Sequence, residues 1–385
     1  MLRLSGLRQS AAQRLSTRGL RQTAAAAQDA FSALEHNMWQ AGAAAYSELF
    51  VNVTTQSTNA LLDGAGLPLT SQMALNIVEK APLENRDEGL RVLDVATGPG
   101  NVARAMAQRG HREVVALDFA PAMLELAQPV ADEFPGCVEL VEGDAAALPL
   151  PDASFDAVVI SFGLLHLPDP QQALKEAYRV LKPGGRVAYS VWASRHQTGV
   201  GLVGSGAHGS HAAGATVEQP TAFDLILGAI GSHGEPVQLP PTPKGEPLPF
   251  FYFSEPENAT KELAAAGFAA ESVAQQHIPS QVALRDEFEL FRMFATATAR
   301  TRALLEAQSA SNLQAIEEAV AATVRAQHRG FLGDGAMNRR TGFLDEDQPG
   351  AEEIWHLGTG GQQWKGGRTP FCVRMPAVVF SAQKK

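Results

Sequence analysis

The chain has 385 residues, of which 45% are hydrophobic and 19% charged, a composition that supports a packed core and argues against a disordered chain. The formal net charge of −10 argues against a general nucleic-acid binder, which needs a basic surface. Two cysteines, Cys137 and Cys372, exclude a disulfide scaffold and a cysteine-only zinc site, and no apolar run reaches the ~18 residues of a membrane-spanning helix.

The charge is unevenly distributed along the chain. Residues 1–28 carry five Arg, no Lys and no acid, and three of these residues, Arg14, Arg18 and Arg21, would share one helix face. Removing five positive charges from −10 leaves −15 for the remainder. An Arg-rich, acid-free N-terminus is typical of organellar targeting, so we expect residues 1–28 to be a transit peptide. The expected location is mitochondrial, with a plastid or the cytoplasm as alternatives.

The first half of the remaining chain alternates between strand and helix patterns. Residues 31–66 predict helices, and residues 70–80 predict one more. From residue 91 the apolar runs become short. Strands are predicted over 91–96, 113–117, 138–142, 156–161 and 185–192, and helices over 102–109, 122–133 and 171–181, the last of them begun by Asp169 and Pro170. This alternation predicts an α/β fold with a doubly wound, mostly parallel sheet.

The alternation stops after residue 193. Residues 199–216 are rich in small residues and histidine, and 235–249 in proline, so both predict loops around a short helix at 221–230. The rest of the chain predicts a helix over 256–266, a strand over 271–283, helices over 285–308 and 311–327, a loop over 330–368 and a terminal strand over 371–381. No internal repeat is visible.

The most informative motif is VLDVATGPGN, residues 92–101, at a predicted strand-to-helix junction. Gly98 and Gly100 allow the backbone to approach a ligand closely, and the following helix offers free N–H groups to a carboxylate or phosphate. By itself, such a loop is compatible with a dinucleotide, a nucleotide or no ligand.

Three aspartates strengthen the case for a ligand site. Asp94, Asp118 and Asp144 lie at the ends of three successive predicted strands, the edge at which open α/β sheets bind ligands. At these places Asp118 can accept both hydroxyls of a ribose, and Asp144 can accept from the exocyclic amine of an adenine. Each acid alone is also compatible with a helix cap or a solvent-exposed loop; together they predict a site.

These motifs resemble the class I S-adenosylmethionine-dependent methyltransferases, in particular the small-molecule group called type 11. The matching stretches are VLDVATGPGN (92–101), ALDFAPAMLELA (116–127), EGDAAALPLPDASFDAVVISFGLLHLPDP (142–170) and ALKEAYRVLKPGGRVAYSVW (173–192). The resemblance implies a Rossmann-like, seven-stranded, mostly parallel sheet with an antiparallel strand near the C-terminus. It also implies S-adenosylmethionine as cofactor and a small-molecule methyl acceptor, whose methylated atom (O, N, S or C) stays open.

The resemblance also implies roles for individual residues. Asp94 would order the motif loop and Asp118 would take the ribose hydroxyls. The other implied cofactor contacts are Ala96, Thr97, Gly98, Gly100 and Asn101 around the methionine moiety and its loop, Phe119 and Met123 beside the adenine, Asp144 and Ala145 at its edge, and Ser161 and Phe162 near the sulfonium. Ala96 stands where the family usually has glycine. We expect it to be tolerated if the backbone there is not left-handed.

A general base is needed only if the acceptor carries a proton, since the sulfonium already activates the methyl group. His166 lies in the segment that leaves the edge of the strand over 156–161 and is the candidate base, with a structural loop histidine as the alternative. Arg195 is compatible with a substrate carboxylate or with a solvated loop. His208 and His211 lack an evident third ligand, so no metal site is expected. Trp39, Tyr46 and Phe50 form an aromatic stripe that predicts either a lid or core.

The expected organisation is one methyltransferase domain over 29–385, made of N-terminal helices (29–90), a cofactor-binding core (91–193), a substrate cap of helices and loops (194–370) and a terminal strand (371–382). Three other functions compete. A quinone-type C-methyltransferase shares the motifs, and a non-catalytic organellar assembly factor could keep the fold. A nicotinamide-dependent oxidoreductase normally has Gly-x-Gly-x-x-Gly, whose third glycine is missing here. No nucleic-acid partner is expected, and the oligomeric state is open.

Overall fold

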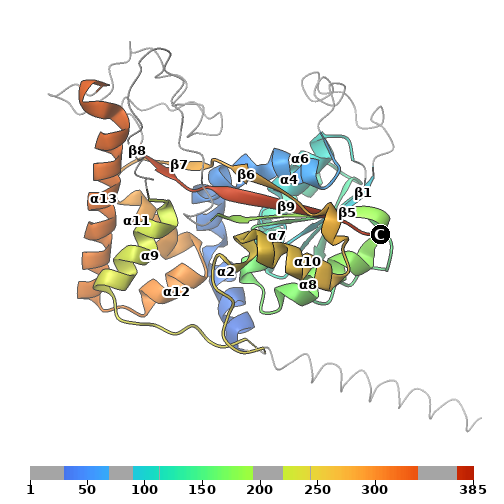
Figure 1. Cartoon of the computed structure of the whole chain (residues 1–385), viewed down its shortest axis with the longest axis horizontal. Coiled ribbons are helices and arrows are strands. Elements are labelled where there is room, and N and C mark those ends of the chain that lie inside the picture. The colour runs from blue at the N-terminus through green and yellow to red at the C-terminus, as the bar shows by residue number, and fades with distance from the viewer. Residues whose placement is uncertain (1–29, 69–89, 112, 194–219, 243, 337–370) are drawn as a thin grey trace, which may run out of the picture.

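The structure, a computed structural model, describes residues 30–68, 90–111, 113–193, 220–242, 244–336 and 371–385 (Figure 1). The predicted transit peptide, the predicted helix over 70–80 and most of the loop over 330–368 lie outside the described residues. The same is true of Arg195, His208 and His211, so the expectations for these residues stay predictions.

A seven-stranded sheet forms the centre of the molecule. Its strands are β1 (Arg91–Val95), β2 (Glu113–Asp118), β3 (Val138–Glu142), β4 (Phe155–Ser161), β5 (Leu181–Trp192), β6 (Ala274–Ile278) and β9 (Ala377–Gln383). They follow the order β3-β2-β1-β4-β5-β9-β6, in which β1 to β5 pair in parallel and β9 runs antiparallel to both neighbours. The predicted fold class, a doubly wound, mostly parallel sheet of seven strands, is therefore confirmed.

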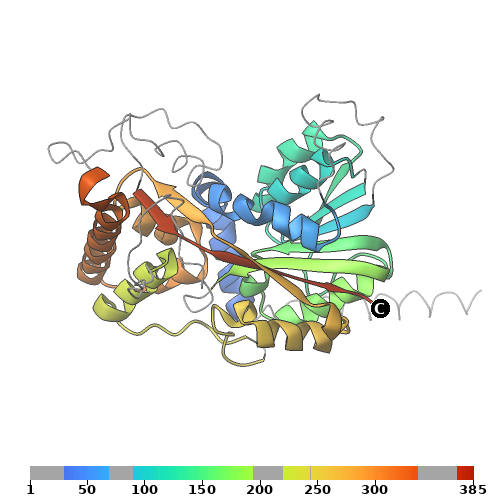
Figure 2. The same cartoon turned by 45° about the horizontal axis from the view of Figure 1, so that its top comes forward.

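Helices cover both faces of this sheet (Figure 2), and its central strands are accordingly mostly apolar and buried. One face carries α4 (Thr58–Gly64), α6 (Asn101–Gln108) and α7 (Pro121–Glu133), whose Leu61, Met106 and Val130 share a core with β1 and β2. The other face carries α8 (Pro170–Val180) and α10 (Pro256–Ala266). The Asp169 carboxylate accepts the Gln172 N–H at 3.0 Å, so the predicted start of α8 is confirmed.

The N-terminal helices connect this core to a second group of elements. The predicted helical region is present as α2 (Ala30–Leu49), α3 (Val51–Thr54), a 3-10 turn and α4. Helix α2 contacts α7 on one side and α11 (Glu289–Ala297) and α12 (Arg300–Glu306) on the other. In Figure 1 it accordingly stands between the sheet and the helices at the left.

The second group, called here the helical lobe, consists of α9 (Ala222–His233), α11, α12, α13 (Ala310–Ala336) and a two-stranded sheet of β7 (Gln281–Leu284) and β8 (Phe371–Arg374). It has its own apolar core, which includes Ile226, Leu290 and Val320. The region expected as a loop-rich cap thus contains a packed helical unit.

Two predicted strands are each divided between the two sheets. The single strand predicted over 271–283 is present as β6 and β7, and the terminal strand predicted over 371–381 is present as β8 and β9. The breaks fall at Pro279 and Pro376. Proline has no N–H for a ladder hydrogen bond, so each strand is interrupted there, and at both positions the chain passes between the large sheet and the small one. The Met375 N–H donates to the Ser280 carbonyl at 2.8 Å across this crossing.

The single helix predicted over 285–308 is also wrong, because the structure has two helices, α11 and α12. Thr298 lies between them in extended conformation. Its hydroxyl donates to the Phe294 carbonyl at 2.8 Å and accepts the Arg302 N–H at 3.3 Å, so one side chain caps both helices. The helix predicted over 311–327 is longer and runs over Ala310–Ala336.

Candidate active site

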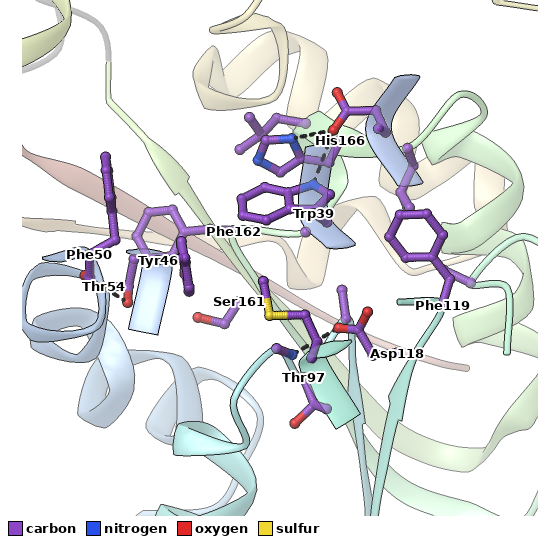
Figure 3. Close-up of a pocket in the computed structure, with 18 of the residues that line it drawn as sticks. Trp39, Tyr46, Phe50, Thr54, Thr97, Asp118, Phe119, Ser161, Phe162 and His166 are labelled. Carbon is purple, nitrogen blue, oxygen red and sulfur yellow. Dashed lines mark hydrogen bonds and ion pairs between the residues drawn. The ribbon is translucent and has the colours of Figure 1, made fainter. Parts of the chain in front are cut away.

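A cavity of about 660 Å³ lies at the carboxyl ends of the central strands, beneath α2 and the helical lobe (Figure 3). Its volume is in the range of small-molecule sites. One part, called here the motif end, is lined by Thr97, Gly98, Asp118, Phe119, Met123 and Asp144; the other, the aromatic end, is lined by Tyr46, Phe50, Trp192, Phe223 and Phe250. Figure 3 shows Trp39 and Phe162 between the two ends.

The fold brings most of the predicted cofactor residues to this one cavity. The predicted residues that line it are Ala96, Thr97, Gly98, Asn101, Asp118, Phe119, Met123, Asp144, Ala145, Ser161 and Phe162, and the candidate base His166 lines it as well. The chain order β1, β2, β3, β4 delivers them because parallel strands end at the same edge. Asp94 and Gly100 are not among the lining residues.

Asp94 lies behind the motif loop, with no exposed surface. Its carboxylate accepts the Thr97 hydroxyl at 2.6 Å and the Ala103 N–H at 3.1 Å, which ties the loop to the first turn of α6. Burial raises the pKa of Asp94 to about 7, against the lowering effect of these two hydrogen bonds. The side chain thus orders the loop without touching the cavity.

Asp118 ends β2 at the floor of the motif end. One carboxylate oxygen accepts the Gly98 N–H at 2.9 Å and the other accepts the Ala120 N–H at 3.0 Å (Figure 3). Burial raises the pKa of Asp118, and the backbone hydrogen bonds act in the opposite direction. Two N–H groups therefore hold this carboxylate in a fixed orientation at the cavity.

The condition under which Ala96 was expected to be tolerated, a backbone that is not left-handed, is not met. Ala96 has φ +57°, in the left-handed region that normally favours glycine, and Phe162 at the end of β4 has φ +53°. A Cβ on Gly163 would lie 2.8 Å from the Ala96 Cβ, so the glycine makes room for this alanine. The motif loop and the end of β4 are therefore held in strained conformations beside the cavity.

Gly100 is required by the packing of α7 rather than by the close approach of a ligand. It has φ +82°, and a Cβ there would lie 3.1 Å from Val130 Cγ2 and 3.2 Å from the Ala127 Cβ. Its missing side chain therefore makes room for α7, whereas Gly98 faces the cavity with only the Met123 sulfur, at 4.0 Å, in reach of such an atom.

The aromatic end is built from stacked and perpendicular rings. Tyr46 and Phe50 stack with their centroids 5.8 Å apart, and Phe162 lies 4.1 Å from Trp192. Burial raises the pKa of Tyr46 to about 12. Trp39, Tyr46 and Phe50, the stripe predicted as lid or core, pack against neighbouring side chains and also line the cavity.

His166 is held by an acid that the sequence did not indicate. Its Nδ1 lies 3.0 Å from Oε2 of Glu35, which also accepts the Trp39 indole N–H at 3.1 Å. The other oxygen of Glu35 accepts the Nε–H of Arg300 at 3.2 Å. Glu35 is 1% exposed and Arg300 8%, so the ion pair is buried. All four residues line the cavity.

One signal in the sequence could have revealed Glu35. Phe31, Glu35 and Trp39 follow i, i+4, i+8 spacing, which places the acid on the apolar face of α2. Nothing comparable marks Arg300, Phe223 or Phe250, because they reach the cavity only through packing of the helical lobe.

The charges around the cavity suit a positively charged cofactor. Glu35, Asp118, Glu142 and Asp144 supply carboxylates, and Arg300 is the only Lys or Arg among the described lining residues. Asp118 suits ribose hydroxyls, and Phe119 with Met123 suits a planar base. A sulfonium nucleoside fits these residues, whereas the pyrophosphate of a nicotinamide dinucleotide would meet the acids without a free cation.

The part of the chain that the structure describes contains neither a metal-binding cluster nor a membrane-spanning helix. It has no group of three or more His, Cys, Asp or Glu placed to hold a metal ion. Within the same ranges no helix has the length and apolar character needed to cross a membrane.

Comparison with known proteins finds a family match within the predicted cofactor-binding core. Residues 93–189 match the family described as "Methyltransferase domain". The demethylmenaquinone methyltransferase of Thermus thermophilus is 47% identical over 111 residues, 29% of this chain and 47% of that protein. The ubiquinone/menaquinone biosynthesis C-methyltransferase UbiE of Methylobacterium nodulans is 49% identical over 105 residues, 26% of this chain and 42% of that protein. The chain spans about half the length of the curated relatives it matches.

Solved structures with similarity include the YcgJ protein of Bacillus subtilis, at 17% identity and a TM-score of 0.41 over 81% of this chain and 97% of that one. Another is an arsenic(III) S-adenosylmethionine methyltransferase of Chlamydomonas reinhardtii, at 28% identity and a TM-score of 0.27 over 31% of this chain and 48% of that one.

The sheet order and the strand-end acids define a class I, Rossmann-like methyltransferase fold. The match over residues 93–189 identifies this part of the chain as a methyltransferase domain of the S-adenosylmethionine-dependent class, so the resemblance noted in the sequence is confirmed.

Proposed function

We propose that this protein transfers a methyl group from S-adenosylmethionine to a small-molecule acceptor bound at the aromatic end of the cavity. One observation carries the proposal: a single cavity joins the methyltransferase motif residues to an aromatic wall. Cofactor and acceptor would therefore share one cavity, which brings them close enough for direct transfer between them.

The chain's own residues would hold the cofactor at the motif end. Asp118 would bind the ribose, Phe119 and Met123 would flank the adenine, and Asp144 and Ala145 would meet its edge. When bound, S-adenosylmethionine supplies a methyl group on a positively charged sulfur. The task of the protein is then to align the acceptor and to exclude water, for which the rings of the aromatic end are suited.

A quinone-type C-methylation is the second candidate. It is supported by the printed names of the curated relatives and by the aromatic wall, which suits a planar apolar ring. The identity to those relatives covers less than a third of this chain. The family match ends at residue 189, so it does not include Phe223 and Phe250 of the aromatic wall. Incubation with methyl-labelled cofactor and either a reduced demethylated naphthoquinone or a metabolite extract separates the candidates by the labelled product.

Cofactor binding gives the first test of the proposal. Calorimetric titration is expected to show binding of S-adenosylhomocysteine and none of NAD. Asp118→Ala removes a charged acceptor from two sugar hydroxyls and is expected to weaken binding about 100-fold, or ~3 kcal/mol.

The control is Asp132→Ala, at an exposed position of α7, with unchanged binding expected. NAD binding by the unaltered protein would overturn the proposal. If a labelled product never forms while cellular function survives Asp118→Ala, the alternative of a non-catalytic assembly factor is favoured.

For the cell location, we propose import into mitochondria directed by residues 1–28. The support is compositional: five Arg and no acid. A fluorescent reporter carrying these residues is expected in mitochondria, and a reporter that stays in the cytoplasm would contradict the proposal.

A further inference from the structure

The geometry around His166 points to a further residue with a defined role. We infer that Glu35 is a positioning residue that keeps His166 ready to accept a proton from a neutral acceptor molecule carrying an O–H or N–H. The inference depends on the proposed function, because it describes how the acceptor of that methyl transfer is prepared.

The first step concerns the charge of Glu35. Its two oxygens accept hydrogen bonds from the Arg300 guanidinium and the Trp39 indole. The guanidinium is itself buried, lies over the Phe31 ring at 4.9 Å and has Glu35 as its charged partner. A buried carboxylate with a cation and an N–H donor in contact is held in its ionised form.

The second step concerns the proton on His166. An ionised carboxylate can only accept, so the Nδ1 atom, 3.0 Å from Glu35 Oε2, must carry a hydrogen. In the neutral ring Nε2 is then the bare nitrogen. The side chain is 17% exposed and lines the cavity, and no described residue hydrogen-bonds to Nε2. Nε2 is therefore the atom available to a bound acceptor.

The third step concerns the proton transfer itself. As the acceptor oxygen or nitrogen bonds to the methyl carbon, the carbon–sulfur bond breaks and its electron pair stays on sulfur. The proton of the acceptor moves to Nε2 of His166, and the imidazolium that forms is paired with Glu35. Because the proton leaves as the methyl group is transferred, a hydroxyl or amine can act as the nucleophile without first becoming an anion.

The fourth step concerns the charge of the acceptor. Arg300 is the only cation among the described lining residues and is already paired with Glu35. At the aromatic end, a carboxylate or phosphate on the acceptor would be buried among rings, with no free Lys or Arg among the described lining residues to pair with it. The cavity therefore selects a neutral acceptor, with apolar rings against the aromatic end.

Nitrogen NMR of the full-length protein tests the role of Glu35. Long-range proton–nitrogen spectra of the histidine rings, recorded at about pH 8 where an ordinary histidine is neutral and assigned with His166→Gln, report which ring nitrogen carries the hydrogen. We expect it on Nδ1 in the unaltered protein and lost from that site, in favour of Nε2, in Glu35→Gln. Glu289→Gln, another buried glutamate that pairs with Arg285 outside the cavity lining, is expected to leave the His166 signals unchanged.

A hydrogen on Nε2, or on both nitrogens, in the unaltered protein would overturn the inference even if Glu35→Gln failed to fold. An unchanged His166 signal in a folded Glu35→Gln variant would do the same. Binding of S-adenosylhomocysteine is measured on the same samples. If binding persists while the tautomer result is negative, only the role of Glu35 fails; if the unaltered protein does not bind it, the proposed function fails.

Two small probes test the class of acceptor. Phenol is neutral and has one O–H, whereas benzoate has a similar ring and a negative charge. With S-adenosylhomocysteine present, phenol is expected to shift the Nε2 signal of His166 and benzoate is expected to leave it in place. A shift with benzoate alone, or with neither probe, would overturn the assignment of a neutral, proton-bearing acceptor.

Discussion

The two ends of the cavity are built in different ways. The motif end comes from one continuous stretch between β1 and β4, and its geometry depends on the backbone: a non-glycine residue with positive φ, a buried acid that orders the loop, and N–H groups that fix a carboxylate. The aromatic end combines Tyr46 and Phe50 near the C-terminal end of α2 with Trp192 of β5 and two residues far along the chain, Phe223 of α9 and Phe250, and it depends on side-chain packing. The motif end, built from backbone geometry, is compatible with a cofactor that many enzymes have in common. The aromatic end, built from packed side chains, is compatible with an acceptor particular to this protein.

The ion pair of Glu35 and Arg300 is the point where these two designs meet, since it joins α2 to α12 beside His166. Arg300→Met would leave a buried carboxylate without its cation. We expect a loss of about 3–5 kcal/mol in the free energy of unfolding, measured by urea titration.

The double variant Glu35→Gln/Arg300→Met has no unpaired charge and is expected to recover part of that loss. If Arg300→Met were as stable as the unaltered protein, the pair would not be what holds the aromatic end to the core, and the contrast between the two ends would weaken.

Asp94 gives a pH-dependent test of the motif end. Because burial raises its pKa to about 7, the folded protein keeps a proton that the unfolded chain releases near pH 4. The protonated Asp94 therefore contributes to the free energy of unfolding at low pH, and this contribution is lost as the pH rises through about 7. The free energy of unfolding changes by at most about 1.4 kcal/mol per pH unit for this reason. Asp94→Asn cannot lose this proton, so its unfolding free energy is expected to change less between about pH 5 and 8.

Chemical denaturation at several pH values measures this difference, with Asp132→Asn at an exposed site as the control that should keep the slope of the unaltered protein. An Asp94→Asn slope equal to that of the control would show that the buried acid does not titrate in this range.

The smallest expected effect concerns the strain at Ala96. A left-handed alanine costs about 1 kcal/mol relative to glycine, partly offset by the greater freedom of glycine in the unfolded chain. Ala96→Gly is therefore expected to stabilise the protein by about 0.5 kcal/mol. Ala105→Gly, within α6, is expected to destabilise it by about 1 kcal/mol. Thermal unfolding of the two variants should shift in opposite directions, and a destabilised Ala96→Gly would show that its methyl contacts outweigh the strain.

Much of the core was predictable because its signals are local. Apolar runs such as Arg91–Val95 and Phe155–Ser161 predict buried parallel strands, and the motif loop between strand and helix is coded by consecutive residues. The predictions fail where the pairing of strands that are distant in the sequence decides the structure. Pro279 marks a possible break in the predicted strand, but the sequence does not say that the chain then joins another sheet, because that depends on the strand 377–383 and its own break at Pro376.

The sequence by itself determined the sheet, the cofactor class and the residues of the motif end, because a strand, a tight loop and a helix N-terminus need only neighbours along the chain. The tertiary structure alone decided the left-handed backbone of Ala96, the partnership of Glu35 with His166 and Arg300, and the rings that line the aromatic end. Residues 35, 166 and 300 meet only after three separate elements have packed, and a buried ion pair forms only where packing excludes water.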